Sequence, residues 1–248
     1  PPFPDCGELL VMAEMVEESS AEVEVFASGE VGPFGFDVIG SEDPEALISW
    51  LRDNNYRVEP PMEPLINVYV EEGFAFVAMR LLDGETSESI QPIEITYPGT
   101  KPMIPLRLTA VAANDNMPIF TWVFANQQAV PENYAHMEIA TEEITFFSFG
   151  GNNYQGLLMR RADALGGRAF ITEFAGPSSS INFQNPYLVE KSQEHAYLTR
   201  LTTSISPDEM TVDPVFALEQ RPDVSNRRDA SNLTGLYDCE RNSGVNIR

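Results

Sequence analysis

The amino-acid sequence predicts an α+β fold, built mainly from antiparallel β-sheet or a β-sandwich with two or three inserted helices. Two segments between residues 43 and 73 combine helix-capping residues with an apolar face of period 3.6. From residue 74 onward apolar residues recur with period two, and turn clusters rich in Pro and Asn separate the runs. Because strands and helices do not alternate regularly, a parallel sheet of βαβ units is not expected.

The first expected elements are two strands. Residues 21–31 alternate Val23 and Val25 with glutamates, which is typical of a half-exposed strand. A Gly-Pro pair then interrupts the chain, and residues 34–39 are expected to form a second strand.

Two helices follow. Asp43 is a suitable N-cap, Pro44 suits the first helical position, and Asn54 with Asn55 tolerates the conformation that ends a helix. The expected inward face of this helix holds Leu47, Ile48 and Leu51. A second helix is expected over residues 64–72, with Gly73 as its stop. Its expected inward residues are Leu65, Ile66, Tyr69 and Val70.

Five further runs are predicted to be strands, and one of them contains Pro105, which indicates an edge strand or a bulge. The runs cover residues 74–82, 92–97, 103–113, 119–126 and 134–140.

The remaining pattern is less regular. Residues 157–167 are predicted to be a helix ended by two glycines, residues 170–180 run into a serine-rich loop, and residues 194–207 are predicted to be a strand. The domain prediction is one β-rich domain over residues 1–213, which lacks an upstream N-terminal portion. A polar tail over residues 214–248 is expected to wrap the surface.

The charge is the strongest departure in composition. The formal net charge is −23 and the isoelectric point is near 4.2. Up to residue 100 there are twenty-one acidic residues and three arginines, a net −18, and from residue 101 there are seventeen and twelve, a net −5. This balance disfavours nucleic acid and anionic membranes as partners. It favours a cationic partner for the N-terminal half, with solubility alone as the alternative.

The chain contains no run of about 18 apolar residues, so no transmembrane segment is expected in it. It begins PPFPDCGELL, which is not a signal peptide, and a processed start or an absent upstream segment is expected. A disulfide between Cys6 and Cys239 would tie the ends together. Two separate thiols, or a bond from Cys6 to an upstream cysteine, are the alternatives.

No segment carries a catalytic motif, and no cofactor is expected. His136 and His195 lack the spacing of a metal site and are read as structural strand residues. The glycine-rich segment 149–161 is a weak candidate for holding an anion and is read as a plain loop.

Carboxylates are abundant, but their spacing does not predict a metal site. The adjacent pairs diverge on a strand and do not chelate together on a helix. They are Glu17-Glu18, Glu42-Asp43, Glu71-Glu72 and Glu142-Glu143. Residues 114–116 have the pattern of an Asx turn. A weak Ca²⁺ site assembled in three dimensions stays an alternative.

Aromatic side chains are concentrated in one predicted strand. Phe120, Trp122 and Phe124 share a face of residues 119–126. They are expected to pack in a core, and an uncovered face would be an interaction patch. Asn232 begins an Asn-Leu-Thr triplet, which we discount as a glycosylation site because such triplets often arise by chance.

Several blocks, co-linear from about residue 31 to residue 216, resemble a known family. They read DPEALISWLRDNNYRV, YVEEGFAFVAMRL, PMIPLRLTAVAA, VPENY and YLTRLTTSISPDEMTVDPVF. The chain resembles bacterial exported proteins of domain of unknown function 2330. The resemblance implies export to the periplasm or cell surface and a β-rich fold, and it brings no established activity or catalytic residue. In the family an N-terminal β-rich stretch with its own cysteines precedes the point where this chain starts.

The functional prediction is an exported, non-enzymatic protein that acts through protein–protein contacts. It is expected to be a periplasmic or extracellular envelope component, or an accessory subunit of a membrane-bound complex. One alternative is a carboxylate-dependent hydrolase or carbohydrate-active protein. Another is a calcium-stabilised adhesive module.

Overall fold

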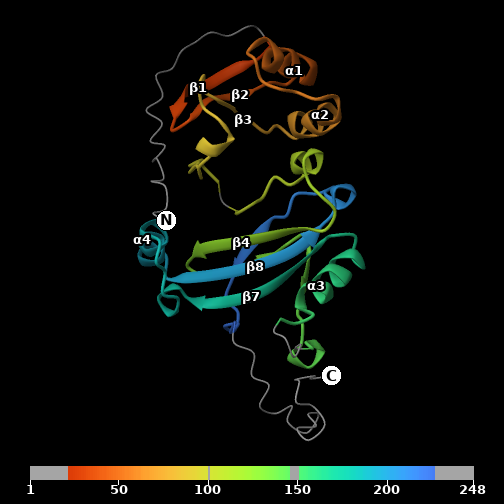
Figure 1. The fold of residues 1–248 in the computed structure, drawn as a ribbon, viewed down its shortest axis with the longest axis vertical. Helices are drawn as coiled ribbons and strands as arrows, with labels where there is room; N and C mark the ends of the chain where they lie inside the picture. Colours follow the sequence, from red (N-terminus) through yellow and green to blue (C-terminus); the bar gives the residue numbers. More distant parts are fainter. Residues whose placement is uncertain (1–21, 100, 146–150, 227–248) are drawn as a thin grey trace, which may run out of the picture. The chain divides into compact units, whose positions relative to one another are not determined.

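The computed structural model describes residues 22–99, 101–145 and 151–226 (Figure 1). By its internal contacts the chain divides into two compact units, Pro1–Pro98 and Gly99–Arg248. We call the parts of these units that the structure describes unit 1 and unit 2. The prediction of one domain over residues 1–213 stays a prediction.

Unit 1 contains a three-stranded antiparallel sheet in the order β1-β2-β3. Its strands are β1 (Glu24–Val31), β2 (Phe34–Gly40) and β3 (Phe76–Leu81). The predicted strands over residues 21–31, 34–39 and 74–82 are thereby confirmed.

Two helices connect β2 to β3, α1 (Pro44–Asp53) and α2 (Glu63–Glu71). Asp43 caps α1, because its Oδ1 accepts from the backbone N–H of Glu45 at 2.8 Å. Asn55 and Gly73 follow the helices with φ angles of 63° and 76°, in the left-handed region where Asn and Gly are favoured. Both helices are confirmed with their predicted caps and stops.

The predicted strand over residues 92–97 is wrong. This segment has no regular secondary structure, and Ile93, Ile95 and Tyr97 are 38%, 43% and 64% exposed. Its apolar residues alternate, but no described strand pairs with it, and a period of two forms a strand only when a neighbour supplies the hydrogen bonds.

Unit 2 contains a four-stranded sheet in the order β4-β8-β7-β6 (Figure 1). Its pairs are antiparallel except for β6 with β7. The strands are β4 (Met117–Ala125), β6 (Ala135–Met137), β7 (Ala169–Pro177) and β8 (Tyr197–Ile205). Strands β5 (Gln128–Pro131) and β9 (Phe216–Glu219) pair antiparallel and form a separate two-stranded ribbon.

The sheet of unit 2 is buried on both faces along β7, whose neighbouring residues point to opposite sides. Phe170 belongs to one core cluster and Ile171 to another, and both are fully buried. The ribbon contributes to the first cluster and α3 (Tyr154–Asp163) to the second. The clusters are Ala129, Tyr134, Phe170, Leu201 and Phe216, and Ile139, Ile144, Leu158 and Ile171.

The α+β prediction is confirmed, and the other misses lie in unit 2. The predicted strand 103–113 forms instead a 3₁₀ turn over Arg107–Val111. The sequence reading missed β5, β9 and α4 (Pro186–Glu194), which Asn185 caps. It also missed β7, because residues 170–180 were expected only to run into a serine-rich loop. The predicted strand over residues 194–207 starts later, at the first residue of β8.

The predicted helix over residues 157–167 corresponds to α3, which begins three residues earlier, and Gly166 and Gly167 follow it with φ angles of 61° and 71°. Residues 227–248 of the predicted tail lie outside the described residues. Within the described ranges, no helix has the length and apolar character needed to cross a bilayer.

Candidate functional site

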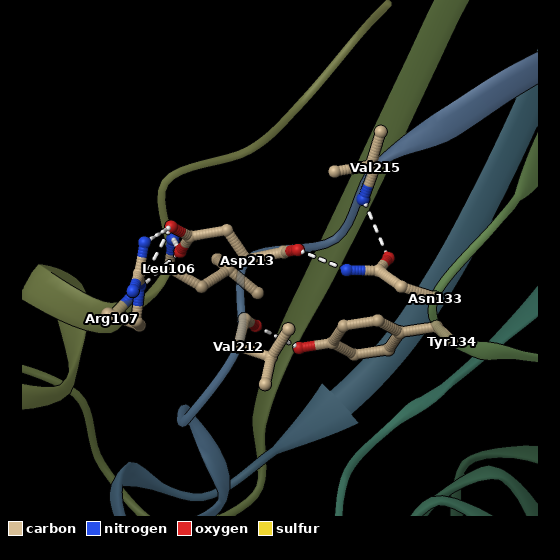
Figure 2. Close-up of polar contacts among 7 residues, drawn as sticks. All are labelled: Leu106, Arg107, Asn133, Tyr134, Val212, Asp213 and Val215. Atoms are coloured by element: carbon tan, nitrogen blue, oxygen red, sulfur yellow. Dashed lines mark hydrogen bonds and ion pairs between the residues drawn. The ribbon is translucent and has the colours of Figure 1, made fainter. Parts of the chain in front are cut away.

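Three separate segments of unit 2 meet around Asp213, and each belongs to one of the sequence blocks quoted above. They contribute Leu106 with Arg107, Asn133 with Tyr134, and residues 212–215 (Figure 2). We call this set the Asp213 network. Its members are joined by six hydrogen bonds and an ion pair.

Asp213 is buried and uses both carboxylate oxygens. Its Oδ1 accepts from the backbone N–H groups of Leu106 at 2.7 Å and Arg107 at 3.1 Å. Its Oδ2 accepts from the Nε of Arg107 at 2.9 Å and lies 2.7 Å from the Nη2. Since Asp213 is 7% and Arg107 9% exposed, the planar guanidinium and the carboxylate satisfy each other almost without water.

The backbone around Asp213 is fixed by two neighbouring side chains. Asn133 donates from Nδ2 to the Asp213 carbonyl at 2.7 Å and accepts from the N–H of Val215 at 2.9 Å. The Tyr134 hydroxyl donates to the Val212 carbonyl at 2.6 Å. Burial, and then the negative charge of Asp213, raises the pKa of Tyr134 to about 12, so this phenol remains a donor at any physiological pH.

The Asp213 network holds structure and does not perform chemistry. A general base needs a lone pair directed at a substrate, and a metal ion needs several convergent oxygens. The Asp213 oxygens are already directed at Arg107 and the backbone. The network joins segments about 80 to 107 residues apart in the chain. Three of the sequence blocks quoted above therefore meet at one place in unit 2.

The two histidines lie apart in unit 2. His195 follows α4, and its backbone N–H donates to the Lys191 carbonyl. His136 is in β6, with its Nε2 2.7 Å from the Thr172 hydroxyl. Burial, and next the charge of Arg221, lowers the pKa of His136, while Glu138 and Glu219 act in the opposite direction. His136 is therefore read as a structural strand residue, as expected, whereas the expected strand position is wrong for His195, which ends α4.

His136 is expected to make unit 2 less stable in acid. Its folded pKa lies below the unfolded value of about 6.5, so below pH 6.5 the unfolded state binds more protons and the free energy of unfolding falls. One proton limits this slope to about 1.4 kcal/mol per pH unit, and the half-exposed ring gives less. In urea unfolding at pH 7.5 and 5.5, His136→Gln should reduce the difference between the two pH values. His195→Gln is the control, and an equal reduction by both variants would contradict the assignment.

Two of the carboxylate pairs that the structure describes contain a side chain engaged in local contacts. Asp43 caps α1, and Glu143 accepts from the Ala140 N–H and forms an ion pair with Arg161. These contacts lower the pKa of Glu143, with the Ala140 N–H as the largest cause. Residues 22–99, 101–145 and 151–226 contain no group of three His, Cys, Asp or Glu side chains that could hold a metal ion. The pair Glu17-Glu18 lies outside them.

The described end of the glycine-rich segment is held by two asparagine side chains. Asn152 Oδ1 accepts from the N–H of Tyr154, the first residue of α3, at 2.9 Å. Asn153 Oδ1 accepts from the N–H of Thr145 at 2.8 Å. Gly151 has a φ angle of 84°, which agrees with a loop containing a left-handed glycine. Residues 114–116 also lie in a turn, where the N–H of Asn116 donates to the Ser206 hydroxyl.

The aromatic face of β4 is partly exposed. Phe120 is 56% and Trp122 43% exposed, whereas Phe124 is half-buried. Phe183 lies against Trp122 and Phe124, with ring centroids 6.0 and 5.7 Å away. The expectation of core packing is therefore wrong for the first two aromatics. Cys6, Cys239 and Asn232 lie outside the described residues.

Unit 1 has an acidic hollow on the outer side of α1, which the sequence alone did not indicate. Four carboxylates line it together with the half-buried indole of Trp50, whose ring stacks on Tyr56 at a centroid distance of 6.3 Å. We call this the Trp50 hollow. Its lining residues are Glu22, Val23, Asp43, Glu45, Ala46, Ser49, Trp50, Asp53 and Asn54.

The Tyr56 side chain, on which the Trp50 ring stacks, is held by a residue of the sheet. Its hydroxyl donates to Asp37 Oδ2 at 2.6 Å, and the other Asp37 oxygen accepts from the Ser28 hydroxyl. Burial, and then Asp37, raises the pKa of Tyr56 to about 12. Residues of strands β1 and β2 thus hold the Tyr56 ring, on which the Trp50 ring stacks.

The comparisons with known proteins find a family but no characterised relative. A family model described as "Uncharacterized protein conserved in bacteria (DUF2330)" matches residues 5–217. No curated protein and no solved structure matches the chain.

Proposed function

Because this chain belongs to the DUF2330 family of uncharacterized proteins conserved in bacteria, we propose a role that rests on its own surfaces. The protein is a non-enzymatic binding component of the cell envelope, exported to the periplasm or cell surface. It acts through protein–protein contacts, as an envelope component or as an accessory subunit of a membrane-bound complex. Its partner presents a cationic surface to unit 1.

The charge of unit 1 is the observation that carries this proposal. Residues 22–98 contain sixteen acidic residues and three arginines, a formal charge of −13. Two of the arginines are engaged within the unit, because Arg52 pairs with Glu63 and Arg57 with Glu59. A field of this sign attracts a basic protein and accelerates their encounter.

The Trp50 hollow is the part of this surface best suited to recognition. A lysine or arginine from the partner can lie over the indole face, where the ring quadrupole attracts a cation. Glu45 and Asp53 also line the hollow, five residues before Trp50 and three residues after it, so they offer ion pairs to the same group. An aromatic centre with a charged rim is also the usual anatomy of a protein interface.

The alternatives gain less support from the described residues. A carboxylate-dependent hydrolase needs a carboxyl group whose pKa is raised beside a second carboxylate. The pKa of Glu143 is shifted in the opposite direction, because its contacts lower it. A calcium-stabilised module needs convergent oxygen ligands, and the described parts of the chain contain no group of three His, Cys, Asp or Glu side chains that could supply them.

The proposal is tested by isolating the tagged protein from native membranes and identifying what co-purifies. We expect Glu45→Lys together with Asp53→Lys to weaken the binding of the cationic partner at least about tenfold. Raising the salt from 50 to 500 mM should also release this partner.

Glu190→Lys with Asp208→Lys is the matched control, because it reverses two exposed charges in unit 2. Binding that both double variants weaken equally would point to net charge in place of the Trp50 hollow. A protein that is isolated alone and intact would overturn the subunit role.

A further inference from the structure

Strand β4 lies at the edge of the unit 2 sheet, and its outer edge offers backbone groups for pairing. On its inner side it pairs with β8, and within the described parts of the chain no further backbone hydrogen bond reaches it (Figure 1). The N–H of Ser178 in unit 2 donates to the Ala196 carbonyl at 3.0 Å, just before β8. Because the bonds of an antiparallel ladder alternate, the even-numbered residues of β8 bond toward β7 and the odd-numbered ones toward β4.

The same alternation decides which residues of β4 point their backbone groups outward. The register pairs odd-numbered residues of β4 with odd-numbered residues of β8, so the even-numbered ones direct N–H and C=O to the outer edge. Pro118 agrees with this assignment, because a proline has no N–H to donate to β8. The outward N–H groups belong to Phe120, Trp122 and Phe124.

These outward residues carry the partly exposed aromatic face of β4. Phe120 and Trp122 are exposed and Phe124 is half-buried, and Phe183 lies against the last two. We call the four side chains the β4 patch. Free hydrogen-bonding groups and exposed apolar area therefore occur on the same strand, and such a combination marks an interaction surface.

The β4 patch is electrically neutral in a chain of net charge −23. Its residues come from two segments, 116–131 and 174–189, that contain no charged residue, whereas the chain's average of 21% would place about seven there. Arg200, whose guanidinium lies 5.6 Å from the centroid of the Trp122 ring, is paired with Glu173 at 2.7 Å. A charged side chain is the usual protection of an edge strand against pairing, and β4 has none.

We propose that β4 pairs with β4 of a second copy about a two-fold axis, so that the protein is a homodimer joined through unit 2. Antiparallel pairing about such an axis brings the outward N–H groups of each copy to the outward carbonyls of the other. The paired residues are the aromatic ones in both copies. Aromatic side chains therefore face each other across the contact, where cross-strand aromatic pairs add to its stability.

Charge favours a second copy as the occupant. Two chains of net charge −23 repel each other, and the repulsion is smallest where a neutral face meets a neutral face. A basic partner gains no attraction from the β4 patch, since that attraction needs the carboxylates of unit 1. An edge strand with alternating donors and acceptors is complementary to itself, which is what an isologous contact requires. The dimer contact is thus separate from the proposed cationic one.

Sedimentation velocity of the full chain tests the pairing, with a reductant present so that Cys6 and Cys239 cannot link two copies. We expect dimer to replace monomer as the concentration rises from about 1 to about 100 µM. Phe120→Lys should raise the dissociation constant at least about tenfold, because the two-fold axis places the added charge in the contact twice. Tyr97→Lys is the matched control, since it adds the same charge at an exposed aromatic of unit 1, and it should dimerise like the wild type.

Salt and hydrogen exchange identify the contact. Raising the salt from 50 to 500 mM should keep or tighten the dimer, because it screens the repulsion between copies, whereas it releases the cationic partner. Amide hydrogen exchange followed by mass spectrometry should be slower in residues 118–125 of the wild type at the higher protein concentration. In Phe120→Lys this exchange should not depend on concentration.

A wild type that stays monomeric up to about 100 µM would overturn the proposal, because the β4 patch would then belong to another occupant. A dimer that Phe120→Lys does not weaken, that high salt dissociates, or in which residues 118–125 exchange as in the monomer would overturn it as well. Circular dichroism verifies that Phe120→Lys is folded. If it is not, Trp122→Thr serves in its place, since it removes an aromatic side chain and retains a residue that favours strands.

Discussion

Asp213→Ala is expected to lower the free energy of unfolding by about 3–5 kcal/mol, the range found when one partner of a buried ion pair is removed. Arg107, which is 9% exposed, would keep its charge without a carboxylate. The N–H groups of Leu106 and Arg107 would also lose their acceptor. Buried donors without partners add to the cost. Equilibrium urea unfolding followed by circular dichroism measures the loss.

Two control variants test whether the loss of stability comes from leaving a buried charge unpaired. Arg107→Met with Asp213→Leu leaves no unpaired charge, so it should cost clearly less than Asp213→Ala. Glu132→Ala breaks the exposed ion pair with Lys101 and should cost at most about 1 kcal/mol. If Asp213→Ala costs no more than Glu132→Ala, the Asp213 network does not stabilise unit 2 as argued.

Local signals made the helices of unit 1 predictable. Asp43, Pro44 and the Asn55 stop act within a few residues of α1, so their effect can be read directly from the sequence. The first two strands were predictable for the same reason, since their alternation reflects one half-exposed face.

Tertiary contacts explain why the strand over residues 103–113 was mispredicted. The alternating apolar residues favour a strand, but Asp213 binds the N–H groups of Leu106 and Arg107 from 107 and 106 residues away. The chain then turns into a 3₁₀ segment. No local pattern encodes an acceptor so distant in the sequence, so the preference for a strand was overridden.

The negative charge around the candidate site was predictable from the sequence, but the position of the site in the fold was not. The acidic N-terminal half follows from counting residues. The Trp50 hollow does not, because Glu22 precedes β1 whereas Asp43 and Asp53 stand at the two ends of α1. The bridge between Ala175 and Val224 was equally hidden, since a single-residue bridge leaves no periodic pattern in the sequence.

Phe170→Ala is expected to destabilise unit 2 by about 3–5 kcal/mol, through lost burial and the cavity that remains. Phe170 is fully buried, and its ring contacts Tyr134 and Phe216 at centroid distances of 5.5 and 5.4 Å. It belongs to the cluster that holds the ribbon of β5 and β9 against the sheet. Urea unfolding followed by fluorescence measures the effect, and Phe170→Leu is the conservative control with a smaller loss.

The same variant tests whether the two units unfold separately. The chain has two tryptophans, Trp50 in unit 1 and Trp122 in unit 2, so Trp50→Phe and Trp122→Phe backgrounds each report one unit. We expect Phe170→Ala to shift the transition seen by Trp122 and to leave that of Trp50 unchanged. Ile48→Ala, in the core of unit 1, should do the reverse. If either variant shifts both transitions together, the units unfold as one cooperative domain, and the prediction from the sequence of a single domain over residues 1–213 is the better description.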